Sequence, residues 1–179
     1  LNLKQEPKNF ISKIAFISPS SYLIIYIILF FSTSFYSDYP SWFLVLGIIL
    51  FIVALVRMSC GFVMLKTTNK NNLSWYIHTV FLSLNGLFWA GFYLSVIVLY
   101  GADIKTMLLL IIIVGITSTA VENLKSNFVL CMVFIASILL PISLVLPFFE
   151  IEANIALSFM FFFYCIYMMS MALKNYKEY

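Results

Sequence analysis

The chain has 179 residues, of which 64% are hydrophobic and 9% are charged. Soluble domains are typically about half apolar and about a quarter charged, so this composition excludes an ordinary soluble domain and indicates a membrane protein. The length suits one domain of several spans, and the net charge of +3 gains meaning only from where the basic residues fall along the chain.

Six apolar segments approach the roughly 20 residues that a helix needs to cross about 30 Å of hydrocarbon. We expect them to span the membrane, in chain order, at residues 19–36, 41–65, 73–99, 105–121, 126–147 and 154–173. The polar breaks between them are short, and short links make consecutive helices antiparallel neighbours. The predicted fold is an all-α polytopic membrane protein, a single domain over residues 1–179 with three antiparallel hairpins in one bundle.

The first segment opens with "SPSS", where we expect Ser18 to cap the helix and Pro19 to be its first residue. Lysines then predict the orientation of all six spans. One side of the membrane would collect eight of them, namely Lys4, Lys8, Lys13, Lys66, Lys70, Lys125, Lys174 and Lys177. The opposite side has only Lys105. Because Lys and Arg in short loops concentrate on the cytoplasmic side, we expect both termini in the cytoplasm, with the bacterial cytoplasmic membrane as the location.

Arg57 interrupts the second apolar segment, nine residues before Lys66. At 1.5 Å of rise per residue, it lies about 13 Å along the helix from that inner end. Its side chain then either bends towards the lipid headgroups or is held inside the bundle as an ion pair or hydrogen-bond anchor. For the second arrangement we expect Glu122 as the partner, although Lys125 competes for that carboxylate at the i+3 spacing.

Small and polar residues form two predicted packing seams, because helices in lipid associate where backbones can approach and polar groups can hydrogen-bond. The third segment presents Asn85, Gly86 and Ala90. The fourth presents one helical face made of Gly115, Ser118, Thr119 and Glu122. A ligand cleft is the alternative interpretation of both faces.

Pro141 lies inside the fifth segment, where it frees a backbone carbonyl and predicts a kink that suits a pocket or a hinge. The three cysteines, Cys60, Cys131 and Cys165, lie in apolar segments without a CxxC pair, so we expect packing residues. His78 is the only histidine, and one histidine makes no recognisable metal or haem site.

The sequence contains no phosphate-binding glycine loop, no serine-elbow motif and no HExxH. It also lacks long polar loops in which a catalytic centre would be assembled. We therefore expect no catalytic residues, no cofactor and no metal, and an autonomous enzyme is disfavoured.

These features together resemble the six-span N-terminal membrane sensor domain of many bacterial sensor histidine kinases and GGDEF-type diguanylate cyclases. The likeness rests on Arg57, on "LSLNGLFWAGF" (82–92) and on "VGITSTAVENLKSNFVLCMVFIASILLPISLVLP" (114–147). It covers roughly residues 45–175, although the turn "ENLKSN" carries more charge than the Ser/Pro-type turn of that family. In such proteins the last span continues into a cytoplasmic signalling helix and then a kinase or cyclase.

The resemblance implies a membrane-embedded sensory or regulatory domain for signal transduction, whose sixth span passes a stimulus to a cytoplasmic output. The expected partners are the lipid bilayer, an apolar or amphiphilic ligand, a kinase or cyclase output and, as an option, a second copy in a homodimer; no nucleic acid is expected. A small transporter or channel subunit is the alternative, with a membrane-complex assembly factor third. Apart from Arg57, the middle of every span lacks charge, which counts against ion-coupled transport.

Overall fold

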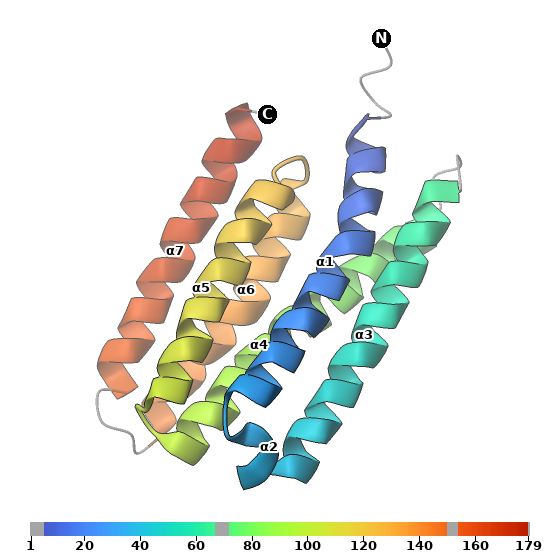
Figure 1. The fold of residues 1–179 in the computed structure, drawn as a ribbon. Helices are drawn as coiled ribbons and strands as arrows, with labels where there is room; N and C mark the ends of the chain where they lie inside the picture. The colour runs from blue at the N-terminus through green and yellow to red at the C-terminus, as the bar shows by residue number, and fades with distance from the viewer. Residues whose placement is uncertain (1–5, 67–71, 150–153, 179) are drawn as a thin grey trace. The chain divides into compact units, whose positions relative to one another are not determined.

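The computed structural model describes the backbone of residues 6–66, 72–149 and 154–178, and within these the side chains of 18–63, 73, 75–149 and 154–178. This part of the chain is almost entirely helical and contains no strand, as the all-α prediction requires. In chain order, the helices are α1 (Glu6–Ser32), α2 (Phe35–Asp38), α3 (Pro40–Lys66), α4 (Asn72–Tyr100), α5 (Ile104–Asn123), α6 (Phe128–Val145), the 3₁₀ turn η1 (Leu146–Phe148) and α7 (Asn154–Glu178) (Figure 1).

Five of these helices, α3 to α7, are long and apolar enough to cross a membrane. The expected first span falls on α1, in which the segment Ser18–Ser32 forms a shorter apolar stretch. By the length and composition of its helices, the chain is an integral membrane protein.

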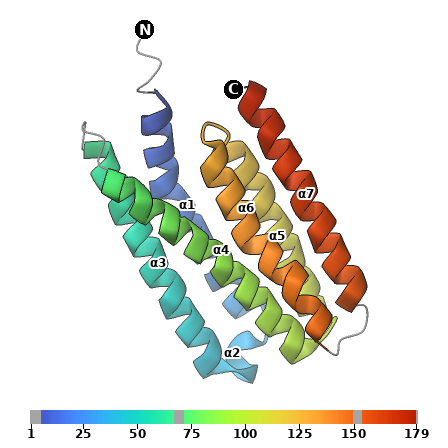
Figure 2. The ribbon, with the colours of Figure 1, turned by 180° about the vertical axis from the view of Figure 1, so that it is seen from behind.

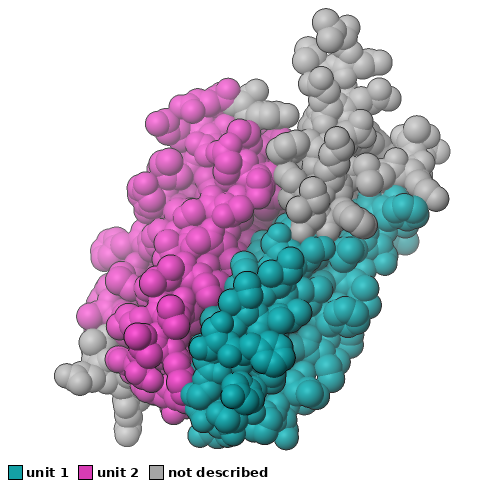
Figure 3. Space-filling view, viewed as in Figure 1, with its two compact units in different colours: residues 1–82 teal, residues 83–179 magenta. Residues whose placement is uncertain are grey.

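The chain divides into two compact units, unit 1 (Leu1–Leu82) and unit 2 (Ser83–Tyr179), drawn in teal and magenta in Figure 3. The boundary falls inside α4, a helix of 29 residues. One continuous helix therefore contributes side chains to both units.

Unit 1 is built on α1 packed along α3, with the short α2 joining them (Figures 1 and 2). The buried Tyr26 hydroxyl donates to the backbone carbonyl of Phe43. Gly47 makes room for this ring, since a Cβ at that position would lie 3.0 Å from Tyr26 Cε1. Phe35 of α2 stacks on Phe43 with 4.4 Å between the ring centroids. These contacts set the register of α1 against the first half of α3.

Unit 2 contains the second part of α4 with α5, α6 and α7, and α6 and α7 lie side by side (Figure 2). Gly101 connects α4 to α5 with φ +65°, a conformation that glycine adopts at little cost. Asp103 then caps α5 through the amide of Ile104, and Asn127 caps α6 through the amide of Leu130. The turns that separate the apolar segments are therefore stabilised locally.

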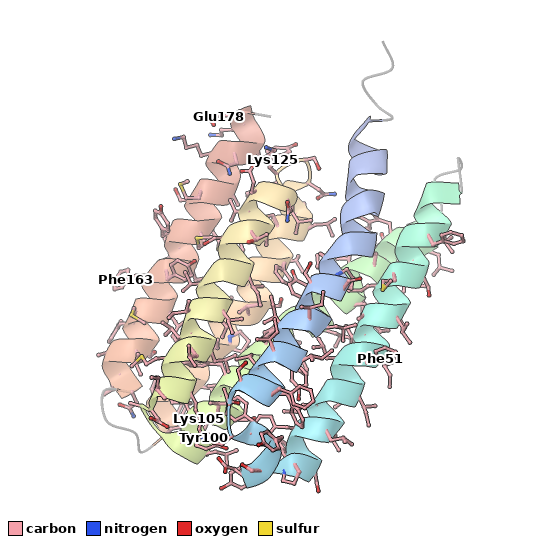
Figure 4. The ribbon with its side chains drawn as sticks, viewed as in Figure 1. Phe51, Tyr100, Lys105, Lys125, Phe163 and Glu178 are labelled. Atoms are coloured by element: carbon pink, nitrogen blue, oxygen red, sulfur yellow. The ribbon has the colours of Figure 1, made fainter. Side chains whose placement is uncertain are left out.

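The buried side of α6 forms the centre of unit 2. Leu130, Phe134, Ile138 and Ile142 are completely buried at a spacing of four residues, as one helical face requires. Other large apolar side chains are left exposed, which is normal where the surroundings are lipid. Phe163 of α7 is an example, and it points outwards in Figure 4.

Candidate functional site

Among the side chains that the structure describes in unit 1, Arg57 is the buried charged one, with only 2% of its surface exposed. Its Nη2 donates to the Ser18 hydroxyl at 3.0 Å. The guanidinium carbon lies 5.8 Å from the centroid of the Tyr22 ring, within the range of a cation–π contact. Ser18 and Tyr22 are one turn apart on α1. The anchoring partners of Arg57 that the structure describes are therefore both neutral.

The hydrogen-bonding capacity of this guanidinium is only partly used. Among the described residues, Arg57 Nε and Nη1 have no hydrogen-bond partner. His78 of α4 is close enough to interact electrostatically with Arg57. It is 2% exposed, and its Nδ1 likewise has no partner in the described part of the chain. Unit 1 thus contains a buried cation beside a buried imidazole, both with polar atoms still available.

The position of Ser18 differs from the expected one. α1 begins at Glu6 and continues through Pro19, so Ser18 lies inside the helix and does not cap it. The prediction was wrong because the residues before Ser18 are already helical, which makes Pro19 an internal residue of α1 instead of its first. The hydroxyl that was expected to cap α1 instead accepts the hydrogen bond of Arg57.

The structure assigns Glu122 a local partner. Its exposed carboxylate, at the end of α5, accepts a hydrogen bond from Lys125 Nζ, which is the competition that the i+3 spacing indicated. Arg57 and Glu122 belong to different units, so a pairing between them stays a prediction. The burial of the guanidinium and its bond to Ser18 favour an internal anchor over an arginine that reaches the headgroups.

Gly86 lies where α4 approaches α6 closely within unit 2. A Cβ added to Gly86 would lie 1.9 Å from Ser137 Oγ and 2.9 Å from Ser137 Cβ, so no larger residue fits without movement. Ala90, one turn later, is 1% exposed. This side of α4 has the close backbone approach that a small-residue seam requires.

Asn85 lies next to this seam and is 1% exposed. Its Nδ2 and Oδ1 make no hydrogen bond to any residue that the structure describes.

Most of the predicted seam on α5 lies outside the packed face of unit 2, although the Ser118 hydroxyl lies 3.2 Å from that of Tyr164 of α7. Gly115, Ser118, Thr119 and Glu122 are all exposed, and a Cβ added to Gly115 would meet nothing within 4 Å. The packed face instead contains Leu109, Ile113, Ile116, Thr117, Ala120 and Val121. Small side chains permit two helices to approach closely but do not require it. In unit 2 the bulkier apolar face of α5 packs against the other helices instead.

Pro141 lies inside α6, which continues beyond it to Val145. Because proline has no amide N–H, the carbonyl four residues earlier, that of Ser137, loses its helical donor. Ser137 is also the residue that faces Gly86, and its hydroxyl donates to the Phe134 carbonyl at 2.8 Å. This close approach of α4 to α6 thus coincides with the point at which the α6 backbone lacks a helical hydrogen bond. Whether α6 bends there stays a prediction.

Two polar contacts between helices were missed by the sequence reasoning. The Tyr164 hydroxyl of α7 lies 3.1 Å from Thr117 Oγ1 and 3.2 Å from Ser118 Oγ of α5. Ser158 of α7 donates to the Ser143 carbonyl of α6 at 2.5 Å. Tyr164 lies in the run "FMFFFYCIYMM", in which no local signal separates it from its neighbours.

These two regions differ in what they offer chemically. The Arg57–His78 pair is positioned by α1, α3 and α4 and presents donors for an oxyanion. The Gly86–Ser137 contact instead offers a point at which α4 and α6 could move against each other. Searches of protein-family models, of curated proteins and of solved structures find no match for this chain, so the function is argued from its own residues.

Proposed function

We propose that the chain is a membrane-embedded sensory or regulatory domain, in which α7 passes a stimulus to a cytoplasmic kinase or cyclase output. The observation that carries this proposal is Arg57, a buried cation within an apolar helix whose described partners are neutral. Ionisable residues within membrane helices are costly, and where they occur they generally mark a functional site. A structural anchor alone would be achieved more cheaply by uncharged groups.

The proposal includes six spans arranged as three antiparallel hairpins, with α1 as the first span. Support comes from the packing of α1 along α3 and of α6 along α7. In Figure 1 the ribbons of α1 and α3 run in opposite directions. With the lysines on the inner side, both termini lie in the cytoplasm of a bacterial cell. Membrane-impermeant labelling of cysteines placed at each terminus of intact cells tests this arrangement, and labelling of either terminus from outside contradicts it.

A sensor needs two arrangements of similar free energy, and a ligand moves the equilibrium only by binding one of them better. The contact between Gly86 and Ser137, beside the carbonyl released by Pro141, is where unit 2 offers such a choice. The stimulus is an apolar or amphiphilic molecule or the state of the bilayer. The output is a cytoplasmic domain or protein, with homodimerisation as one route of coupling.

The test is a fusion of residues 1–179 to a cyclase output, assayed in membranes with and without added amphiphiles. We expect Arg57→Gln to change the output level or its response, while Lys105→Gln, which removes a cation from the first turn of α5, leaves both unchanged. An output that no amphiphile, no bilayer change and no Arg57 substitution alters would rule out sensing. Flux measurements on the purified protein in liposomes separate the transporter alternative, because a sensor conducts nothing.

A further inference from the structure

We propose that Arg57 and His78 form a binding site for the oxyanion headgroup of an amphiphile, such as the carboxylate of a long-chain acid or the phosphate of a lysolipid. This inference names the ligand class of the proposed sensor and rests on that function for its biological meaning. The binding itself is a property of unit 1 that is measurable without any output.

The first step concerns charge. Arg57 is buried to 98%, since 2% of its surface is exposed, and its described partners, Ser18 and Tyr22, carry no charge. A buried cation is stable when it is paired with an anion and fully hydrogen-bonded. Hydroxyl and aromatic groups satisfy part of the second requirement and none of the first. An oxyanion at this position satisfies both.

The second step concerns the donors. Arg57 Nε and Nη1 and His78 Nδ1 have no hydrogen-bond partners among the described residues. Guanidinium N–H groups are the preferred donors to carboxylate and phosphate. An imidazole nitrogen donates to the same kind of oxygen when it carries the proton. Arg57 of α3 and His78 of α4 therefore suit the same type of ligand atom, an anionic oxygen, whereas a metal cation would be repelled by the guanidinium.

The third step concerns the rest of the ligand. Arg57 and His78 both lie within helices that are apolar enough to span a membrane. A bare ion reaches such a depth only by losing its hydration, which is costly. An anion attached to an acyl chain is already concentrated in the bilayer.

The experiment measures the thermal unfolding of the purified chain in an uncharged maltoside detergent. The probes are oleate, lysophosphatidate, the neutral methyl oleate and inorganic phosphate. At a hundredfold excess over Kd, we expect oleate or lysophosphatidate to raise Tm by about 5–10 °C, and methyl oleate to leave it unchanged. A full shift with inorganic phosphate alone would replace the amphiphile with a free ion and overturn that part of the proposal.

Variants identify the site. Arg57→Gln should abolish the shift, and His78→Leu, which removes the imidazole donor, should weaken the affinity about tenfold, as the loss of one hydrogen bond to a charged group predicts. Lys105→Gln removes a cation elsewhere and should leave the shift intact. If Arg57→Gln does not fold, Arg57→Lys replaces it, with an expected affinity about tenfold below wild type because lysine lacks the planar fork.

The proposal fails if wild-type protein shows no shift with either anionic amphiphile, or if an Arg57 variant shows the same shift as wild type. Should neither Arg57 variant fold, an unchanged affinity in His78→Leu overturns it. Failure of the proposed function looks different, because the purified chain would then bind the amphiphile while the fused output ignores it.

Discussion

The two units place polar groups within apolar helices in opposite ways. Unit 1 buries a full charge, Arg57, whose partners among the described residues, Ser18 and Tyr22, are neutral. The helix contacts of unit 2 instead use hydroxyls, such as Tyr164 between Thr117 and Ser118. A hydroxyl can bond to a carbonyl of its own helix, as Thr117 does to Ile113 at 2.9 Å, and so it is tolerated in lipid at low cost. A guanidinium has five N–H donors, and the carbonyls of its own helix cannot accept from all of them. This difference favours packing as the role of the unit 2 hydroxyls and supports the proposed binding role of Arg57.

The largest expected effect is that of Arg57→Ala, which removes the bond to Ser18 and leaves a cavity. We expect the free energy of unfolding in detergent to fall by about 2–4 kcal/mol, as for other large-to-small changes at buried sites. Arg57→Lys should be tolerated in part.

Arg57→Met is the matched control for this change, because methionine restores most of the volume without the charge. Replacing a buried charge by a well-packed apolar group is often neutral or stabilising, so Arg57→Met should unfold within about 1 kcal/mol of wild type. A methionine variant as unstable as the alanine variant would show that the charge itself stabilises unit 1, and the contrast between the units would disappear.

Gly86→Ala is expected to have the next largest effect. The new Cβ would overlap Ser137, and overpacking of this kind costs about 1–3 kcal/mol. Alanine regains up to about 1 kcal/mol of helix propensity, so we expect the free energy of unfolding to fall by about 1–2 kcal/mol. Thermal unfolding of the purified variant measures it.

Gly115→Ala provides the comparison, because a Cβ there meets nothing within 4 Å. It should be neutral or stabilising. Removal of the Ser137 side chain by Ser137→Gly should restore part of the stability lost in Gly86→Ala, since contacting residues give non-additive effects. Equal losses at Gly86 and Gly115 would show that the close approach of α4 to α6 is not real.

Tyr164→Phe removes only the hydroxyl that joins α7 to α5. Hydrogen bonds between membrane helices contribute about 0.6 kcal/mol on average, so we expect a loss of that size in chemical unfolding. Tyr167→Phe is the control, because Tyr167 lies on the same helix and is exposed. A double-mutant cycle with Thr117→Val should show that the two changes are not additive, whereas strict additivity would argue against the contact.

The smallest expected effect is that of Glu122→Gln. The carboxylate is exposed and paired only with Lys125 among the described residues, and exposed ion pairs contribute about 0–1 kcal/mol. Stability should therefore be nearly unchanged. A loss as large as that of Arg57→Ala would instead indicate the predicted pair between Arg57 and Glu122, and it would link the two units through an ion pair.

The membrane helices were predictable because apolar length is a strong signal. The segments expected at 105–121 and 126–147 correspond to α5 (Ile104–Asn123) and α6 (Phe128–Val145). The start of α1 was harder to predict, because the first part of the helix is polar and precedes Pro19. The sequence therefore favoured a helix that begins at that proline. A proline inside a membrane helix is more readily tolerated than in a soluble one, so it is a weak boundary signal here.

The candidate site was predictable only in its central residue. Arg57 is conspicuous as a charge within an apolar segment, but its partners Ser18 and Tyr22 depend on the register of α1 against α3. That register is set by the fit of Tyr26 over Gly47, a contact between side chains distant in sequence. The packed face of α5 was missed for a different reason: the small and polar residues were expected to form the packing seam, whereas the face that packs is the apolar one with Leu109, Ile113 and Ile116.

The length of α4 has a further consequence. Its apolar part, Trp75–Tyr100, has 26 residues and would measure about 39 Å, against about 30 Å of hydrocarbon. A helix longer than the hydrocarbon core tilts, kinks or locally thickens the bilayer, and the mismatch grows in thinner lipid. Because α4 contributes residues to both units, we expect the acyl-chain length of the lipid to affect both units. Reconstitution in short- and long-chain lipids, followed by infrared dichroism of the helices, would reveal that response.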